Sequence, residues 1–398
     1  MSPRATSSSP PGAPPAARPA VPPVGGPAVP TVRGPAVPTA GGPAVPTVVG
    51  GPAVPTVVGG PAVRTVVRPV RSPDGSWETV SARPHPRLRP GVIGYRGFRL
   101  AFPGPRARLE APIGAVTLML GFEGSVRITE ATGGWVGVRD GKGGTPPAGL
   151  RTVELSTVLS GMSTTPVLGE HDGRLAGIEV LLTPWAAFTI FRTALHELTG
   201  WRGHPDDLGA LPGEAATGEL AHRLGALSSW RARFHLLDEV LGHWLASGPR
   251  CASGTVRAWY ALTHSGGSAP VAQVAEQVGW GVRHLENRFR EQIGLTPKAA
   301  ARVLRLQRAR RLLCAGSTQA ETAAACGYYD QAHLSGEFKA MTGCTPREFA
   351  LARGPRTDPG GPPATDRLAG EATSLVLRRP ARRAGPGSAY FSKTRDPR

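Results

Sequence analysis

A pattern of fifteen residues occurs twice in this chain, 49 positions apart. Each copy reads His-Leu, three variable residues, Phe, a basic residue, three more variable residues, Gly, one variable residue, Thr-Pro and a basic residue. The copies span 284–298 and 333–347, and an Ala-rich run that ends in Gly and an aromatic residue precedes each. A unit that recurs in this way suggests a protein that contacts one long ligand at two regularly spaced points. Double-stranded DNA is the obvious ligand of that kind.

The first copy predicts a helix from about Val282 to Ile293 with one apolar side. Leu285, Phe289 and Ile293 are spaced four residues apart, so they share one helix face. Gly279, just upstream, permits the left-handed turn that a helix–turn–helix corner needs. In a major groove, Arg side chains read guanine and Asn side chains read adenine. The outward side, which we predict to contact DNA, consists of Arg283, His284, Asn287 and Arg288.

A second helix is predicted between the copies, from about Pro297 to Leu313. Thr296 is a plausible N-cap, and proline suits the first helical position. At 1.5 Å per residue this helix is about 25 Å long, enough to hold two reading helices roughly one DNA turn, about 34 Å, apart. Its basic side suggests phosphate contacts from Arg302 and Arg305, with a solvated helix face as the alternative.

The second copy predicts a reading helix from the N-cap Asp330 through Met341. Leu334, Phe338 and Met341 face inward by their spacing. The residues predicted to face DNA are Gln331, Ala332, Ser335 and Lys339, with Gly336 among them.

The two histidines that open the copies leave two interpretations open. Each imidazole can contact DNA, or it can pack against or cap its own helix. We predict DNA contact for His284. For His333 we favour packing, because it lies beside the core residue Leu334.

Residues 265–352 resemble the DNA-binding domain of the AraC/XylS family of bacterial transcription regulators. The paired His-Leu-x-x-x-Phe units, the Gly-Tyr-x-Asp-Gln-x-His-Leu stretch and the closing Gly-x-Thr-Pro-Arg-Glu-Phe carry the resemblance. It implies two helix–turn–helix units, joined by a long helix, that bind adjacent major grooves. It also implies base contacts from Arg283, His284 and Asn287, and from Gln331, Ala332 and Ser335. Residues 85–264 resemble, less specifically, the effector-binding half of an actinobacterial branch of that family.

Three departures from the family pattern predict that the second unit is less stable and reads less sequence than the first. Gly281 stands where a Ser N-cap is usual. Gly336 stands where the family commonly has an Arg that touches DNA, and glycine weakens a helix by about 1 kcal/mol relative to alanine. Gln319 and Thr322 stand where the first helix of the second unit usually presents aliphatic residues.

The remainder of the chain predicts an α+β fold. Residues 1–72 carry a Pro-rich repeat and predict a disordered tail. Short apolar runs between Gly- and Pro-rich turns over 73–183 predict a β-rich, barrel-like domain for effector binding or dimerisation. Residues 184–248 predict a helical connector, with a first helix that ends at Gly200. The all-α domain with two helix–turn–helix units then occupies 250–353, and 354–398 predict a disordered basic tail.

The distribution of charge and the motifs present indicate which classes of function fit this chain. The net charge of +18 is concentrated outside residues 91–280, which hold 16 basic and 16 acidic residues, and this favours a polyanionic partner for the duplicated region. The cysteines lack the spacing of a zinc site, and we expect free thiols in a cytoplasmic protein without a membrane span or secretion signal. His196-Glu197 begins like a zinc-protease helix, but Gly200 stands where the second metal His is required. We therefore expect no enzyme and no cofactor.

In a second hypothesis, residues 91–260 carry the main function, as a small-molecule-binding or interaction module. DNA contact would then only tether this module. A pocket lined by Phe122, Trp135, Trp185 and Phe188 would fit, although such residues are more often core. Both hypotheses allow an unidentified small-molecule effector. They also allow a homodimer and contact with RNA polymerase.

Overall fold

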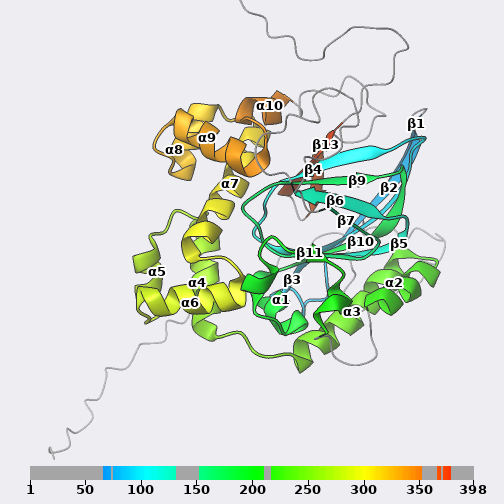
Figure 1. Cartoon of the computed structure of the whole chain (residues 1–398), viewed down its shortest axis with the longest axis horizontal. Coiled ribbons are helices and arrows are strands. Elements are labelled where there is room, and N and C mark those ends of the chain that lie inside the picture. The colour runs from blue at the N-terminus through cyan, green and yellow to red at the C-terminus, as the bar shows by residue number, and fades with distance from the viewer. Residues whose placement is uncertain are drawn as a thin grey trace, which may run out of the picture. The chain divides into compact units, whose positions relative to one another are not determined.

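A computed structural model of the chain describes residues 66–72, 75–130, 152–209, 217–351, 365–368 and 371–377, all within the compact unit Gly59–Arg398. Strands dominate its first half and helices its second, with two short strands near the C-terminus (Figure 1). The predicted α+β class is confirmed. No helix in the described ranges is long and apolar enough to cross a membrane.

The larger of two antiparallel sheets supplies most of the core of the β domain. β10 lies at its centre, hydrogen-bonded to β3 on one side and to β5 on the other. Leu118, Leu120, Ile178 and Leu182 on these strands are fully buried. In spatial order the strands are β1 (Val66–Ser72), β2 (Gly75–Ala82), β3 (Val92–Ala101), β10 (Arg174–Leu182), β5 (Val116–Glu123), β8 (Val158–Ser160) and β11 (Arg202–Gly203).

The smaller sheet completes the barrel-like domain as a second, separate layer. Its β4 connects directly to β5 of the larger sheet through residues 111–115. In spatial order its strands are β12 (Thr365–Leu368), β13 (Glu371–Leu377), β4 (Arg106–Glu110), β9 (Val167–His171), β6 (Val126–Glu130) and β7 (Thr152–Leu155).

Three of these strands lie in segments that we expected to be disordered tails. β1 belongs to 1–72 and pairs with β2, whereas β12 and β13 belong to 354–398 and β13 pairs with β4. The reason is local sequence, because the β-branched run Val66-Val67 and the apolar run Leu375-Val376-Leu377 suit a strand that completes an exposed sheet edge. The other residues of both tails lie outside the described ranges.

The helical connector comprises α1 (Pro184–Phe191), two 3-10 helices η1 (Leu195–Leu198) and η2 (Pro205–Leu208), α2 (Thr217–Ala226) and α3 (Trp230–Ser247). The expectation of one helix up to Gly200 was wrong. Arg192 adopts a left-handed conformation with φ 53°, which ends α1 after Phe191. The chain then enters β11, which pairs with β8. Trp230 of α3 covers the larger sheet, since its ring packs so closely on Gly97 that a Cβ there would overlap it.

The C-terminal domain is entirely helical. α6 has the predicted bounds and α7 extends two residues beyond Leu313. Thr296 caps α7 as predicted, because its side chain accepts a hydrogen bond from the Ala299 amide at 3.2 Å. The helices are α4 (Ser253–His264), α5 (Val271–Gln277), α6 (Val282–Ile293), α7 (Pro297–Ala315), α8 (Gln319–Cys326), α9 (Gln331–Thr342) and α10 (Pro346–Leu351).

Candidate DNA-binding surface

The first reading helix, α6, presents four of the predicted contact residues on one exposed face. Gly279 has φ 75°, which makes the sharp corner between α5 and α6. The inner face of α6 is fully buried through Leu285, Phe289 and Ile293, as predicted. This burial fixes the rotation of α6 and leaves the opposite face in solvent. The exposed side chains are Arg283, His284, Asn287 and Arg288.

Those four side chains are not equally free. The His284 ring packs edge to face on Trp280, with ring centroids 4.7 Å apart. Arg288 forms an ion pair of 3.0 Å with Glu291 one turn later. Within the described ranges, Arg283 and Asn287 make no side-chain hydrogen bond or ion pair. Of these four side chains, they are the two that would lose no such partner on meeting a base edge.

The second reading helix, α9, is well capped. The Asp330 carboxylate accepts a hydrogen bond from the His333 amide at 2.7 Å, as the predicted N-cap requires. Leu334, Phe338 and Met341 are buried on its inner face. Of the predicted contact residues, Gln331, Ala332 and Lys339 are exposed, and Ser335 is half-buried.

Two of the predicted contact residues on α9 share a partner on α8. The Gln319 side-chain oxygen accepts from Ser335 Oγ at 3.4 Å and from Gln331 Nε2 at 3.5 Å. Both distances are long for hydrogen bonds and both groups remain accessible. From the sequence, Gln319 was notable only as a departure from the family pattern. The structure places its side-chain oxygen next to two of the predicted contact residues of α9.

His333 packs in the same way as His284. Its ring lies edge to face on Tyr328, with centroids 5.4 Å apart, and its Nδ1 accepts from the Tyr329 amide at 3.2 Å. The second copy has one residue more between the Gly-aromatic turn and its His than the first copy. The histidine–aromatic contact is nevertheless present in both units, which supports a packing role for both imidazoles.

Arg302 and Arg305 of α7 meet an acidic side chain of α9 that the sequence analysis missed. Arg302 Nε lies 3.4 Å from Glu337 Oε2, and Arg305 Nη2 lies 3.6 Å from Glu337 Oε1. The Glu337 side chain is only 9% exposed, against 38% and 23% for the two arginines. The signal that could have revealed it is an acid directly before the buried Phe338, on a helix that follows the Arg-rich α7.

Tyr328 completes this cluster between α7 and α9. Arg305 lies over the Tyr328 ring, with its Cζ 5.5 Å from the centroid. Burial raises the pKa of the Tyr328 phenol, and the nearby Glu337 carboxylate raises it further. The phenol is therefore neutral at physiological pH. We call Arg302, Arg305, Tyr328, His333 and Glu337 the α7–α9 cluster.

The long helix α7 separates the two reading helices. Figure 1 shows α5 and α6 near one end of α7, and α8, α9 and α10 near the other. Nineteen residues at 1.5 Å each give α7 a length of about 28 Å. This length is close to the pitch of one DNA turn, roughly 34 Å.

Comparison with known proteins agrees with this geometry. The helix-turn-helix domain family matches residues 274–352. These residues are an AraC/XylS-type DNA-binding domain. Over 93 residues the chain is 33% identical to the probable thc operon regulatory protein of Rhodococcus erythropolis, a match that covers 22% of this chain and 28% of that protein. The chain thus spans less than a third of the length of that relative.

Several solved structures have regions that are similar to parts of this chain. The C-terminal domain of the response regulator AraT from Geobacillus stearothermophilus is 21% identical, with a TM-score of 0.26 over 27% of this chain and 93% of its own. An AraC-type regulator from Chromobacterium violaceum is 27% identical, with a TM-score of 0.24 over 25% and 92%. ToxT from Vibrio cholerae is 10% identical, with a TM-score of 0.34 over 64% and 95%.

The AraC/XylS-type domain is hydrogen-bonded to the preceding part of the chain through both α6 and α7. At the C-terminal end of α6, the Gly294 carbonyl accepts from Thr199 Oγ1 at 2.5 Å. On α7, Gln307 Oε1 accepts from the Gly114 amide at 2.7 Å, and Arg310 Nη2 donates to the Pro112 carbonyl at 3.0 Å. The first unit and the linking helix are therefore both attached to the β domain and its connector.

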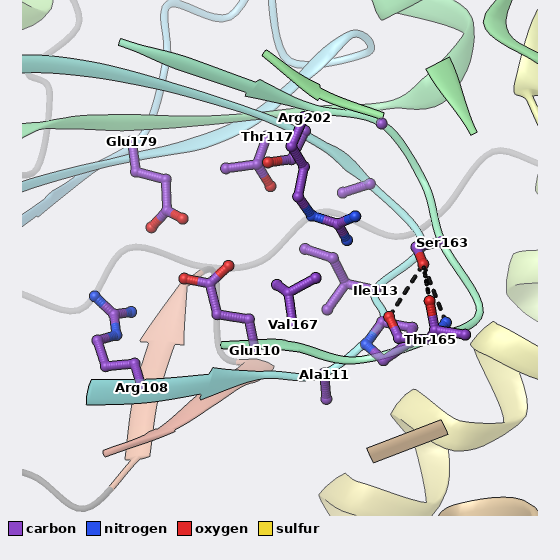
Figure 2. Close-up of a pocket in the computed structure, with 14 residues that line it drawn as sticks. Arg108, Glu110, Ala111, Ile113, Thr117, Ser163, Thr165, Val167, Glu179 and Arg202 are labelled. Carbon is purple, nitrogen blue, oxygen red and sulfur yellow. Dashed lines mark hydrogen bonds between the residues drawn. The ribbon is translucent and has the colours of Figure 1, made fainter. Parts of the chain in front are cut away.

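A pocket lies between the two sheets of the β domain, but not where the sequence suggested. Phe122, Trp185 and Phe188 belong to the hydrophobic core or pack against it, and Trp135 lies outside the described ranges. None of these three described residues lines the pocket. Its wall instead combines charged and polar side chains with small apolar ones (Figure 2). It includes Arg108, Glu110, Glu179, Arg202, Thr117 and Ser163.

Proposed function

We propose that this protein is a sequence-specific DNA-binding transcription regulator that inserts α6 and α9 into successive major-groove segments of promoter DNA. One observation carries the proposal. Two exposed reading faces lie near opposite ends of a single rigid helix whose length approaches one DNA turn. The match of residues 274–352 to a helix-turn-helix family supports it. An enzymatic role has no comparable support.

In this mechanism, specificity comes mainly from the first unit. Arg283 offers a guanidinium to the O6 and N7 acceptors of guanine, and Asn287 offers an amide to adenine. Gln331, Ala332 and Ser335 give α9 a smaller set of base contacts, because Gly336 has no side chain to add. Arg288 and Lys339 lie on the same exposed faces, where phosphates flank the groove. His284 contributes at most one contact beside its Trp280 packing.

Arg302 and Arg305 act on DNA chiefly through α9. Their contacts with Glu337 fix the position of the second reading helix relative to α7. Each guanidinium retains some solvent exposure, which also leaves it able to meet a phosphate. Their loss should therefore weaken binding to all sequences alike, because neither side chain reads a base.

A test is gel-shift binding of the full chain to promoter fragments and to scrambled duplexes across a salt series. Arg283→Ala and Asn287→Ala should each relax sequence preference by about 1–3 kcal/mol. Arg231→Ala, which removes an exposed arginine of α3 far from the reading faces in sequence, is the matched control and should have no effect. Arg305→Ala should lower affinity for all duplexes by a similar factor.

Two outcomes contradict the proposal. The first is an absence of sequence preference even near about 50 mM salt, where phosphate contacts are strongest. The second is an equal, sequence-independent loss for Arg283→Ala, Asn287→Ala and Arg305→Ala, which would refute the division between base and phosphate contacts.

Regulation by the N-terminal domain is part of the proposal. A sensor that alters DNA binding must bind its effector more tightly in one state of the DNA-binding domain than in the other. The hydrogen bonds from residues 112, 114 and 199 to α6 and α7 provide the physical connection. Homodimerisation through the β domain and contact with RNA polymerase stay predictions.

A further inference from the structure

An exposed tyrosine stands in the turn that leads into the second reading helix. Tyr329 is 90% exposed, the highest value among the large hydrophobic side chains that the structure describes. It lies one residue before Asp330, the N-cap of α9. Among the described residues, its ring contacts no other aromatic ring and its hydroxyl makes no hydrogen bond. Packing within the chain therefore does not explain an aromatic side chain at this position.

The turn that carries Tyr329 is one residue longer than the matching turn of the first unit. In the first unit the cap residue Gly281 follows Trp280 directly, whereas Tyr329 separates Tyr328 from the cap residue Asp330. Trp280 and Tyr328 each pack on the histidine of their own copy. Tyr329 has no counterpart in the first unit, so it is an addition to the shared turn.

The backbone at Tyr329 is held in place although its side chain is free. The Tyr329 amide donates to His333 Nδ1 at 3.2 Å, and the Asp330 carboxylate accepts from the His333 amide at 2.7 Å. The His333 ring in turn packs on Tyr328. The point at which the Tyr329 side chain leaves the turn is therefore fixed, which lowers the entropy that a partner must overcome to bind it.

This turn borders the predicted reading face of α9. Gln331 and Ala332, two of the predicted base contacts, follow Asp330 in the first turn of the helix. When the first turn of a reading helix enters a major groove, a residue just outside the helix lies at the edge of that groove, where the phosphates run. Tyrosine is among the side chains that contact phosphate oxygens in protein–DNA complexes. The exposed surface of Tyr329 is thus continuous with the surface proposed to bind DNA.

The neighbouring Asp330 restricts the kind of contact that this turn can make. Its carboxylate accepts from the His333 amide, but its negative charge still opposes a phosphate that lies directly against the start of α9. The Tyr329 side chain is longer than that of Asp330, so its hydroxyl can reach a phosphate that stays clear of the carboxylate. A phenol can donate one hydrogen bond to a phosphate oxygen, and it carries no charge.

We propose that Tyr329 is a DNA contact of the second unit, with its hydroxyl donating to a phosphate oxygen at the edge of the major-groove segment that α9 enters. This rests on the proposed function, because it adds a contact to the same DNA-binding surface. The contact reads no base. It fixes the register of the second unit on the duplex, where Gly336 has no side chain to offer, and its affinity does not depend on counterion release.

The first experiment compares Tyr329→Phe with the parent chain by gel shift on a promoter fragment and on a scrambled duplex across a salt series. The variant should bind both duplexes about fivefold or more weakly, because it loses a hydrogen bond to a charged acceptor. Its salt dependence should equal that of the parent chain, since no charge is removed. Lys339→Gln should instead reduce the salt slope by about 1. The matched control is Tyr260→Phe, at a tyrosine of α4 that is 37% exposed, and it should bind as the parent chain does.

The second experiment locates the acceptor on the DNA. Duplexes that carry one methylphosphonate at a time replace a charged phosphate oxygen by a methyl group. At one position beside the second reading helix, the parent chain should lose about fivefold or more in affinity, and Tyr329→Phe should lose little. Such non-additivity indicates a direct contact. Additive losses at every position overturn the proposal.

The third experiment uses the parent chain, so it decides even if a Tyr329 variant does not fold by circular dichroism. Tetranitromethane nitrates accessible tyrosines, and peptide mass spectrometry locates the products. Tyr329 should be nitrated readily in the free chain and should be protected by promoter DNA, whereas nitration of Tyr260 should not change. Equal nitration of Tyr329 with and without bound DNA overturns the proposal.

The outcomes separate this contact from the proposed function. Sequence-preferring binding that Tyr329→Phe leaves unchanged counts against the Tyr329 contact alone. A parent chain that binds every duplex alike counts against the proposed function alone, provided that Tyr329→Phe still weakens binding. If Tyr329→Phe and Tyr329→Ala bind DNA normally and lose only transcription by added RNA polymerase, the side chain contacts a protein partner, and the proposal is overturned.

Discussion

The two helix–turn–helix units share one sequence pattern but are held in place by different parts of the molecule. In the first unit, the C-terminal end of α6 is attached to the connector. Thr199 of the connector donates to the Gly294 carbonyl, and within the C-terminal domain the buried Gln292 accepts from the Ala252 amide, which precedes α4, at 3.0 Å. The N-terminal end of α6 begins at Gly281 without any side-chain cap. The N-terminal end of α6, which carries the predicted base contacts, therefore has no side-chain cap, whereas its C-terminal end is held by hydrogen bonds.

The second unit shows the reverse arrangement. Asp330 caps α9, and a capping box formed by Thr318 and Glu321 begins α8. The body of α9 is held to α7 by Glu337, through Arg302 and Arg305. The second unit is thus attached to the linking helix rather than to the connector.

The two units therefore share the residues that form the helix–turn–helix fold. The residues that differ between the copies determine whether a unit is attached to the connector or to α7. Among the described residues, hydrogen bonds from the connector and the β domain go to the end of α6 and to α7, whereas the polar contacts that hold α9 go to α7 and α8. We therefore expect substitutions at the attachments to affect the two units separately.

The largest effect is expected from the α7–α9 cluster. Glu337→Gln leaves two partly buried arginines without a counter-charge and should lower the free energy of unfolding of the second unit by about 2 kcal/mol. The matched change in the first unit is Glu291→Gln, because Glu291 pairs with Arg288 at the surface with 40% exposure. That loss should be at most about 0.5 kcal/mol. Hydrogen exchange should show faster opening of α8–α10 only for Glu337→Gln; equal protection in both variants would contradict the role of the cluster.

The second effect concerns one buried position that differs between the units. Thr322 and Val274 occupy equivalent places before the Gly-aromatic turn, and both are fully buried. The Thr322 hydroxyl has no hydrogen-bond partner among the described residues. Thr322→Val should therefore stabilise the second unit by about 1 kcal/mol, and Val274→Thr should destabilise the first by a similar amount. Chemical denaturation measures both, and a loss of stability in Thr322→Val would show that the hydroxyl is satisfied.

Much of the C-terminal domain could be predicted because its signals are local. The spacing of Leu285, Phe289 and Ile293 fixed the bounds of α6, and Thr296-Pro297 marked the start of α7. Helix periodicity and caps depend on residues within one or two turns. The capping box formed by Thr318 and Glu321 is an equally local sequence signal, although the sequence analysis did not predict it.

The remaining features depend on residues far apart in the chain. Nothing local places β10 between β3 and β5, or brings β13 beside β4. Glu337 meets Arg302 and Arg305 only after two helices have folded against each other. Glu110 and Arg202 come from different sheets, so the pocket exists only once both have formed. Sequence patterns give the faces of such elements but not their partners.

A smaller gain is expected at Gly336, in the interior of α9. A Cβ there would meet no atom within 4 Å, and the position is exposed. Gly336→Ala should therefore stabilise the second unit by about 1 kcal/mol through helix propensity alone. Thermal unfolding of the full chain checks this, with the exposed Ala340→Gly on the same helix as the reciprocal control. A destabilised Gly336→Ala would mean that the glycine has a role beyond the absence of a side chain.

The smallest effect is expected at the uncapped start of α6. Gly281 has φ −69° and ψ 150°, a conformation that serine adopts readily, and a Cβ there would meet no atom within 4 Å. Gly281→Ser should supply the missing cap and raise stability by a few tenths of a kcal/mol, about the difference between Gly and Ser N-caps. In the second unit, Asp330→Ala removes the equivalent cap and should cost about 1 kcal/mol. If Gly281→Ser instead weakens specific DNA binding without a change in stability, the bare start of α6 serves close approach to the duplex, because a backbone without a side chain can lie nearer to a phosphate.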